Sequence, residues 1–189
     1  MLTSRQFETI LSKNKTMENH EMKTTKYLTQ AAIIAALYVC LCLLQNLLLP
    51  NSASMAVQFR AAEALCVLAL FTPAAIPGLA LGCLLFNLTQ AGALPLDFFI
   101  GTAASLLAAL GMYMLRNVRL WKLPLLALCM PALVNGLLVG AELSIYIEGS
   151  SFWFNALGVA AGELAVLFTL GIALYGALSH RGLGNRIFR

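Results

Sequence analysis

The chain has 189 residues, of which 60% are hydrophobic and only 11% are charged, and its formal net charge is +4. A soluble domain carries about a quarter charged residues, so this composition indicates that lipid surrounds most of the protein. The composition excludes a disordered chain, a coiled coil and a disulfide-stapled secreted domain. It also leaves no length for a soluble catalytic domain.

Residues 1–28 are polar, contain charges of both signs and show no sustained apolar periodicity. We predict that this segment is a flexible cytoplasmic extension without a packed helix, with Met17 and Met22 as alternative starting residues. The apolar run at 29–49 is longer than the hydrophobic region of a signal peptide. It is therefore predicted to be the first membrane span.

Two apolar pieces follow at 60–71 and 74–90, separated by the segment TPAAIPG. A single helix across both would be about 43 Å long, against a hydrocarbon core of about 30 Å, and would contain two prolines near its middle. We therefore predict two separate spans. Three further spans are predicted at 96–116, 123–144 and 152–179.

The positive charges indicate how these six spans are oriented. With six spans, all Lys and Arg residues except Arg60 fall on one side, including Arg116, Arg119 and Lys122 and the basic tail at 180–189. Lys and Arg accumulate on the cytoplasmic side of membrane proteins, whereas five spans would separate these loops. The sequence predicts an all-α integral membrane protein of the cell membrane, with a six-helix domain at 29–179 and both termini in the cytoplasm.

Several polar residues lie on the predicted spans or at their outer ends. A charge near the bilayer centre costs about 2.5–3.5 kcal/mol on insertion scales, so such residues line a cavity or pair with one another. They cluster toward the predicted outer side. The candidate substrate-binding residues are Gln58, Phe59, Arg60, Glu63, Asn87, Asp97, Asn135, Glu142, Trp153, Asn155 and Glu163.

The charged and amide candidates also have structural interpretations. Arg60 and Glu63 are three residues apart, which suits a local ion pair on a helix. Asp97 follows a proline at a predicted helix start, where a carboxylate can cap the helix. Asn135 and Glu142 share one face of their span, an arrangement that favours a pocket wall.

The last span and the aromatic residues leave similar alternatives open. Asn155 and Glu163 suit either a binding site or an interhelical hydrogen bond that holds the bundle together. Phe59 and Trp153 fall at the outer interface, where an aromatic belt is expected without any ligand. A flat ring beside polar groups also suits a planar heterocycle.

Other motifs argue against catalysis in this chain. The five cysteines lie in apolar runs without metal or redox spacing, and both histidines lie outside the spans, so no metal site and no enzyme activity are expected. The sequence contains no GxxxxGK[ST] motif for ATP. Uphill transport would therefore require a partner or an ion gradient.

Three stretches, VQFRAAEAL, FTPAAIPGLALGCLLFN and VNGLLVGAEL, are followed by FWFNALGVAAGEL. Together they resemble the QueT family of queuosine-precursor transporters, over residues 23–178. This family is similar to the substrate-binding S components of energy-coupling factor (ECF) transporters. The resemblance implies a six-helix, S-component-like bundle that captures 7-cyano- or 7-aminomethyl-7-deazaguanine from outside. This chain has Ala62 where the family motif often has Ser.

The resemblance also implies partners. A membrane T component and two cytoplasmic ATPase subunits would use ATP, so this chain needs no cofactor, and nucleic acid is not an expected partner. S components of this kind dock on the T component through small residues of the first helix. Ala31, Ala32, Ala35 and Ala36 match that pattern, although small residues at this spacing also serve packing within a bundle.

The candidate residues suit such a ligand chemically. Glu163 or Glu142 would accept hydrogen bonds from the N1–H and amine edge of the base. The donors to its carbonyl would be Asn135, Asn155, Gln58 or Arg60. Three alternatives remain: an S component for another small metabolite or vitamin, a self-sufficient ion-coupled carrier, and a structural or regulatory membrane protein.

Overall fold

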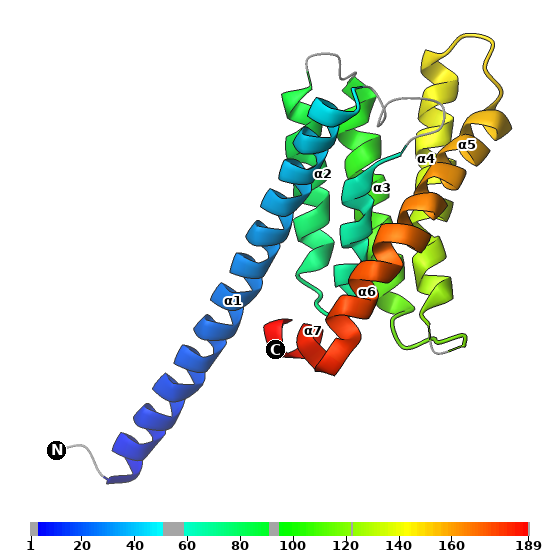
Figure 1. Ribbon diagram of the computed structural model, residues 1–189. Coiled ribbons are helices and arrows are strands. Elements are labelled where there is room, and N and C mark those ends of the chain that lie inside the picture. The colour runs from blue at the N-terminus through cyan, green and yellow to red at the C-terminus, as the bar shows by residue number, and fades with distance from the viewer. Residues whose placement is uncertain (1–3, 51–58, 91–94, 122, 189) are drawn as a thin grey trace.

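The computed structural model describes residues 4–50, 59–90, 95–121 and 123–188, with side chains described from residue 21 onward. The regular elements in these ranges are all helical (Figure 1), which confirms the predicted all-α class. In chain order they are α1 (Ser4–Leu48), η1 (Ala61–Leu70), α2 (Ala75–Thr89), α3 (Pro95–Met114), α4 (Leu125–Tyr146), α5 (Phe152–Val166), η2 (Leu167–Gly171), α6 (Ile172–Ser179), η3 (His180–Gly182) and α7 (Leu183–Phe188).

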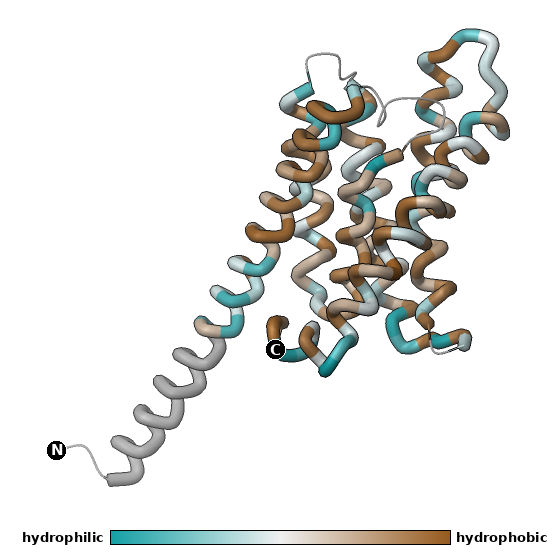
Figure 2. Tube along the Cα trace, in the orientation of Figure 1, coloured by the Kyte–Doolittle hydropathy of each residue, from teal (hydrophilic) through white to brown (hydrophobic). Residues whose placement is uncertain are grey.

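Successive long elements run in alternating directions along the bundle, and the start of α1 and the final helix α7 lie at the same end (Figure 1). We call this end the basic end, because it contains Lys23, Lys26, Arg116, Arg119, Arg181 and Arg186. Figure 2 shows hydrophilic backbone segments there and mostly hydrophobic ones along the bundle. The opposite end, where α1 and α4 finish and α3 and α5 begin, is called the polar end.

Four helical stretches are long and apolar enough to cross a membrane: Glu21–Leu48, Pro95–Met114, Leu125–Tyr146 and Phe152–Phe188. Two shorter apolar helices, η1 with 10 residues and α2 with 15, lie between the first and second of them along the chain. These lengths and the hydropathy indicate a helical membrane protein. The helices η1 and α2 are apolar but shorter than the four candidate spans, so their length by itself does not identify them as membrane spans.

The 3₁₀ helix η1 forms the centre of the bundle, because every residue from Ala62 to Ala69 is buried. It is apolar throughout except for Glu63. The break between η1 and α2 falls in the segment TPAAIPG, since a proline lacks the N–H that a continuing helix would need. Thr72 shapes this turn: its hydroxyl accepts a hydrogen bond from the Ala74 N–H at 3.2 Å.

Helix α1 begins at Ser4, so the backbone is helical in the polar segment where no packed helix was expected. Starting a helix costs more than extending one, and the apolar run of α1 provides the starting point. The helix projects beyond the bundle at its N-terminal end (Figure 1). The division of the chain at residue 28 therefore does not correspond to a change in backbone structure.

Small residues allow two pairs of helices to pack closely. A Cβ on Gly78 would lie 2.8 Å from the Ala31 carbonyl oxygen, and one on Gly82 would lie 2.7 Å from the Tyr38 Cβ. Likewise, a Cβ on Gly140 of α4 would lie 2.6 Å from the Ala156 Cα of α5. The α1–α2 and α4–α5 contacts thus depend on glycine at these positions.

We predict that Gly82→Ala destabilises the protein by about 1–3 kcal/mol, because the added methyl group overpacks the α1–α2 contact. The readout is the thermal unfolding midpoint of the purified protein in detergent. Gly176→Ala is the matched control, since its added Cβ meets nothing within 4 Å and alanine favours a helix over glycine by up to about 1 kcal/mol. Equal midpoints for the two variants would contradict this account of the packing.

Candidate functional site

The interior of the bundle contains polar side chains from every long helix. The buried polar residues are Gln45, Glu63, Thr72, Asn87, Ser105, Asn135, Glu142, Asn155 and Glu163. Six of these are among the candidates identified in the sequence. Glutamates are almost never fully buried unless they are paired, so the surroundings of the three buried glutamates define the site.

Arg60 and Glu63 form the predicted local ion pair at the start of η1. The Arg60 Nη1 lies 4.0 Å from the Glu63 Oε1, and Glu63 is fully buried. Both oxygens of Glu63 also accept hydrogen bonds from neighbours: the Tyr38 hydroxyl donates to Oε1 at 2.7 Å and the Cys66 thiol donates to Oε2 at 3.2 Å. Glu63 is therefore satisfied within the protein.

Arg60 makes further contacts but keeps one donor open. Its Nη1 donates to the Tyr38 hydroxyl at 3.4 Å and lies 3.8 Å from the Cys83 Sγ. The buried Arg60 Nε has no hydrogen-bond partner among the described residues. A charged N–H left open inside the bundle is available to an acceptor on a ligand.

Glu163 joins α5 to α4 through Asn135. The Asn135 side-chain amide donates to the Glu163 Oε1 at 3.0 Å, so the two residues predicted to share the site are in contact. The second oxygen, Oε2, is buried and has no hydrogen-bond partner among the described residues. Glu163 is thus held in place and still has one open acceptor.

Glu142 of α4 is the third buried glutamate, and its Oε1 also lacks a hydrogen-bond partner within the described part of the chain. The Asp97 side chain of α3 interacts with it. Asp97 is placed by Asn87 of α2, whose amide donates to the Asp97 backbone carbonyl at 2.8 Å. Two carboxyl groups from neighbouring helices therefore come together at the polar end.

The described site pairs the Arg60 guanidinium with Glu63 alone, at 4.0 Å, and also contains the buried acids Glu142 and Glu163. The described site therefore contains more acids than bases. Such a site favours a ligand that donates hydrogen bonds or carries positive charge.

The remaining candidates lie outside this group of acids. Asn155 is fully buried, but its amide donates to the Ser144 hydroxyl at 3.1 Å and its oxygen accepts from the Ser150 hydroxyl at 2.8 Å. Trp153 is 66% exposed and packs edge-on against Phe152, and Phe59 is also exposed. Gln58 lies outside the described residues.

The four alanines proposed for docking divide between two faces of α1. Ala31 and Ala35 are buried against α2, where Gly78 and Gly82 approach their carbonyl oxygens. Ala32 and Ala36 are exposed. The first pair thus serves internal packing, and only the second pair is free to meet another protein.

The residues that hold Arg60 and Glu63 carry little signal in the sequence and are not among the candidates predicted from it. Tyr38 lies inside the first apolar run and gives no polar signal of its own. Cys66 and Cys83 lie in apolar runs without metal or redox spacing, yet both contact the ion pair. The spacing of Glu63 and Cys66, three residues apart on one helix, is the signal that could have identified one of them.

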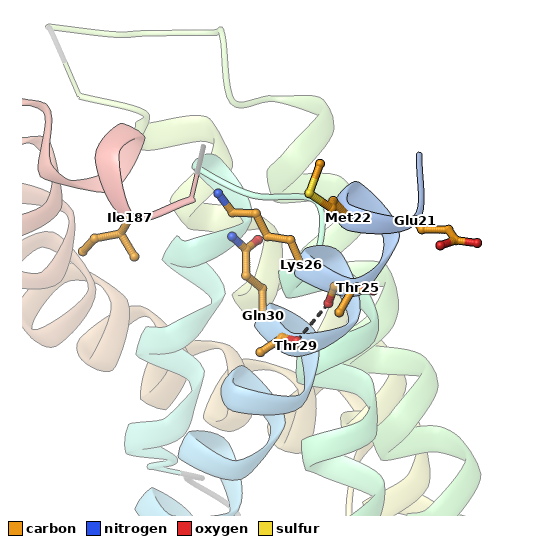
Figure 3. Close-up of a pocket in the computed structure, with 7 residues that line it drawn as sticks. All are labelled: Glu21, Met22, Thr25, Lys26, Thr29, Gln30 and Ile187. Atoms are coloured by element: carbon orange, nitrogen blue, oxygen red, sulfur yellow. Dashed lines mark hydrogen bonds between the residues drawn. The ribbon is translucent and has the colours of Figure 1, made fainter. Parts of the chain in front are cut away.

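A groove of about 600 Å³ opens between α1 and α7 at the basic end (Figure 3). Lys26, Gln30 and Ile187 line it from the two helices, and the Thr29 hydroxyl donates to the Thr25 carbonyl at 2.9 Å. None of the predicted substrate-binding residues lines this groove. Within the described residues, no group of three or more His, Cys, Asp or Glu side chains is arranged to hold a metal ion.

The family to which the chain belongs was identified by comparison with known proteins. No curated protein and no solved structure matches the chain. A family model described as QueT transporter matches residues 28–180, a range that contains η1, α2 to α6 and the three buried glutamates Glu63, Glu142 and Glu163. The chain therefore belongs to the QueT transporter family, in agreement with the resemblance seen in its sequence.

Proposed function

We propose that this chain is the substrate-binding S component of an ECF-type transporter and imports a queuosine precursor, 7-cyano- or 7-aminomethyl-7-deazaguanine. Membership of a transporter family supports the transport role. The observation that carries the substrate class is the set of open polar atoms in one interior: Glu163 Oε2, Glu142 Oε1 and Arg60 Nε. A ligand that fills these positions must combine donors with an acceptor.

A 7-deazaguanine has that combination. Its N1–H and exocyclic amine form a donor edge that a carboxylate can accept, and its ring carbonyl accepts a hydrogen bond. We assign the donor edge to Glu163, because Asn135 already fixes the orientation of this carboxylate. The carbonyl would face the open Nε of Arg60.

Glu142 would then face the substituent at position 7. A protonated aminomethyl group is attracted by the neighbouring carboxyls of Glu142 and Asp97, whereas a nitrile carries no charge to interact with them. The same two acids would favour the aminomethyl form over the cyano form.

We expect Glu163→Gln and Glu142→Gln each to weaken binding of 7-aminomethyl-7-deazaguanine at least roughly tenfold, because each replaces a carboxyl oxygen, which accepts hydrogen bonds, with an NH2 group, which only donates them. Binding is measured by isothermal titration calorimetry on the purified protein in detergent. Glu148→Gln is the matched control, since Glu148 is an exposed acid in the loop between α4 and α5. Unchanged affinity in both site variants would remove these assignments.

We further propose that η1 and α2 are spans, giving six in all with both termini in the cytoplasm. At about 2.0 Å per residue η1 is about 20 Å long, and at 1.5 Å per residue α2 is about 22 Å long, both less than a hydrocarbon core of about 30 Å. A short 3₁₀ helix is tolerated at membrane depth when protein surrounds it, and η1 is buried on all sides.

This topology predicts that a fluorescent-protein fusion after Arg189 emits in intact bacterial cells, whereas an alkaline phosphatase fusion at the same position is inactive. Both reporters depend on the side of the membrane that they reach. A phosphatase fusion in the α4–α5 loop, at Gly149, should be active in the same cells. Active phosphatase at the C-terminus would contradict the six-span topology.

Energy for import would come from partner subunits: a T component and two ATPases. Exposed Ala32 and Ala36 on α1 support a docking face of small residues. The main alternatives are an S component for another small metabolite or vitamin and a carrier that works without ATPases.

The partner requirement predicts that cells unable to make deazaguanines accumulate the labelled base only when this chain and a T component with its ATPases are expressed together. Cells expressing this chain alone are the control. Uptake by the chain alone would favour the self-sufficient carrier. Binding of a vitamin without binding of deazaguanine would favour the other S-component specificity.

A further inference from the structure

We propose that Tyr38 and Gln45 of α1 are positioning residues that hold Arg60 in the substrate site, so that the position of α1 sets the affinity for the ligand. This inference rests on the proposed function, since it requires Arg60 to face a ligand. Neither residue is expected to touch the ligand itself.

Tyr38 connects both members of the ion pair. It is fully buried, and its hydroxyl donates to the Glu63 Oε1 at 2.7 Å. The hydroxyl oxygen of Tyr38 also accepts a hydrogen bond from the Arg60 Nη1 at 3.4 Å. The direct Arg60–Glu63 contact is long, at 4.0 Å. The Tyr38 hydroxyl therefore bridges the two charges and fixes which way the guanidinium points.

Gln45 holds the backbone on both sides of Arg60. Its side-chain amide donates to the Phe59 carbonyl, and its side-chain oxygen accepts from the Ala61 N–H at 2.7 Å. The residue at the start of η1, Arg60, makes no side-chain capping bond of its own. A neighbouring helix thus supplies the cap that a helix start usually takes from its own sequence.

These two residues lie seven apart and therefore share one face of α1, together with buried Ala31, Ala35 and Cys42. Ala32 and Ala36 lie on an exposed face. A contact that moves α1 relative to η1 would pull on Tyr38 and Gln45 directly, and the guanidinium of Arg60 would move with them. Through these bonds, α1 contacts Arg60 and its neighbours directly, with no other helix between α1 and η1.

The first test is Tyr38→Phe, which removes only the hydroxyl. We expect a roughly tenfold loss in affinity for 7-aminomethyl-7-deazaguanine, the net effect of losing a hydrogen bond to charged groups. Tyr175→Phe is the matched control: the Tyr175 hydroxyl also accepts from an arginine, Arg119 at 2.6 Å, but at the basic end. This control should keep the affinity of the unmodified protein.

A double-mutant cycle separates positioning from general stabilisation. If Tyr38 acts through Arg60, then Arg60→Gln should weaken binding by itself, and adding Tyr38→Phe to it should cause no further loss. An equal loss in both backgrounds would overturn the proposal, as would unchanged affinity in Tyr38→Phe or in Arg60→Gln. A role in stability alone would lower the unfolding midpoint and leave the affinity unchanged.

Gln45→Met is the second variant and keeps the test decisive if Tyr38→Phe does not fold. It removes both hydrogen bonds to the backbone around Arg60 while keeping a side chain of similar length, and the same loss of affinity is expected. Failure of the unmodified protein to bind any deazaguanine would reject the proposed function. Binding by the unmodified protein with unchanged affinity in both α1 variants would reject the positioning role alone.

Discussion

A carboxylate removed from water must be paired or hydrogen-bonded, and the interior of this bundle is arranged around that requirement. Glu63 meets it fully, with a base, a phenol and a thiol around its two oxygens. It lies on η1, the element that the other helices surround. Because the donors come from α1 and from η1 itself, the pairing of one acid also fixes how these two helices lie against each other.

The short central helix follows from the same requirement. A 3₁₀ helix bonds its backbone less well than an α-helix, so it survives only where other protein surrounds it and lipid does not reach it. The small residues of η1 allow neighbouring helices to come close, as the glycines of α2 and α4 do elsewhere. Close approach in turn brings Tyr38 of α1 and Cys83 of α2 into contact with the Arg60 guanidinium.

The sequence was informative where a residue type is unfavourable in its local setting, as a polar side chain is in an apolar span and a proline is inside a helix. Polar groups in apolar runs predicted the buried acids, and the prolines of TPAAIPG predicted two helices in place of one. The sequence did not indicate in which direction each side chain points from its helix. It could not tell that Asn155 faces two serines, that Trp153 lies outside, or that Ala31 faces α2 while Ala32 is exposed. Those outcomes depend on helix rotation and helix crossing, which are set by contacts distant in sequence.

The three buried glutamates differ in how many of their oxygens have hydrogen-bond partners among the described residues, and in the proposed function this difference separates a structural role for Glu63 from a binding role for the other two. Glu63 has partners on both oxygens, so a ligand could reach it only by displacing Tyr38 or Cys66. Glu163 has one oxygen held by Asn135 and one open, and Glu142 has an open oxygen beside a second acid. A group that is fixed at one atom and open at the next loses little freedom on binding, because its orientation is already set. Binding a donor-rich base would therefore complete the hydrogen bonding that the protein leaves unfinished.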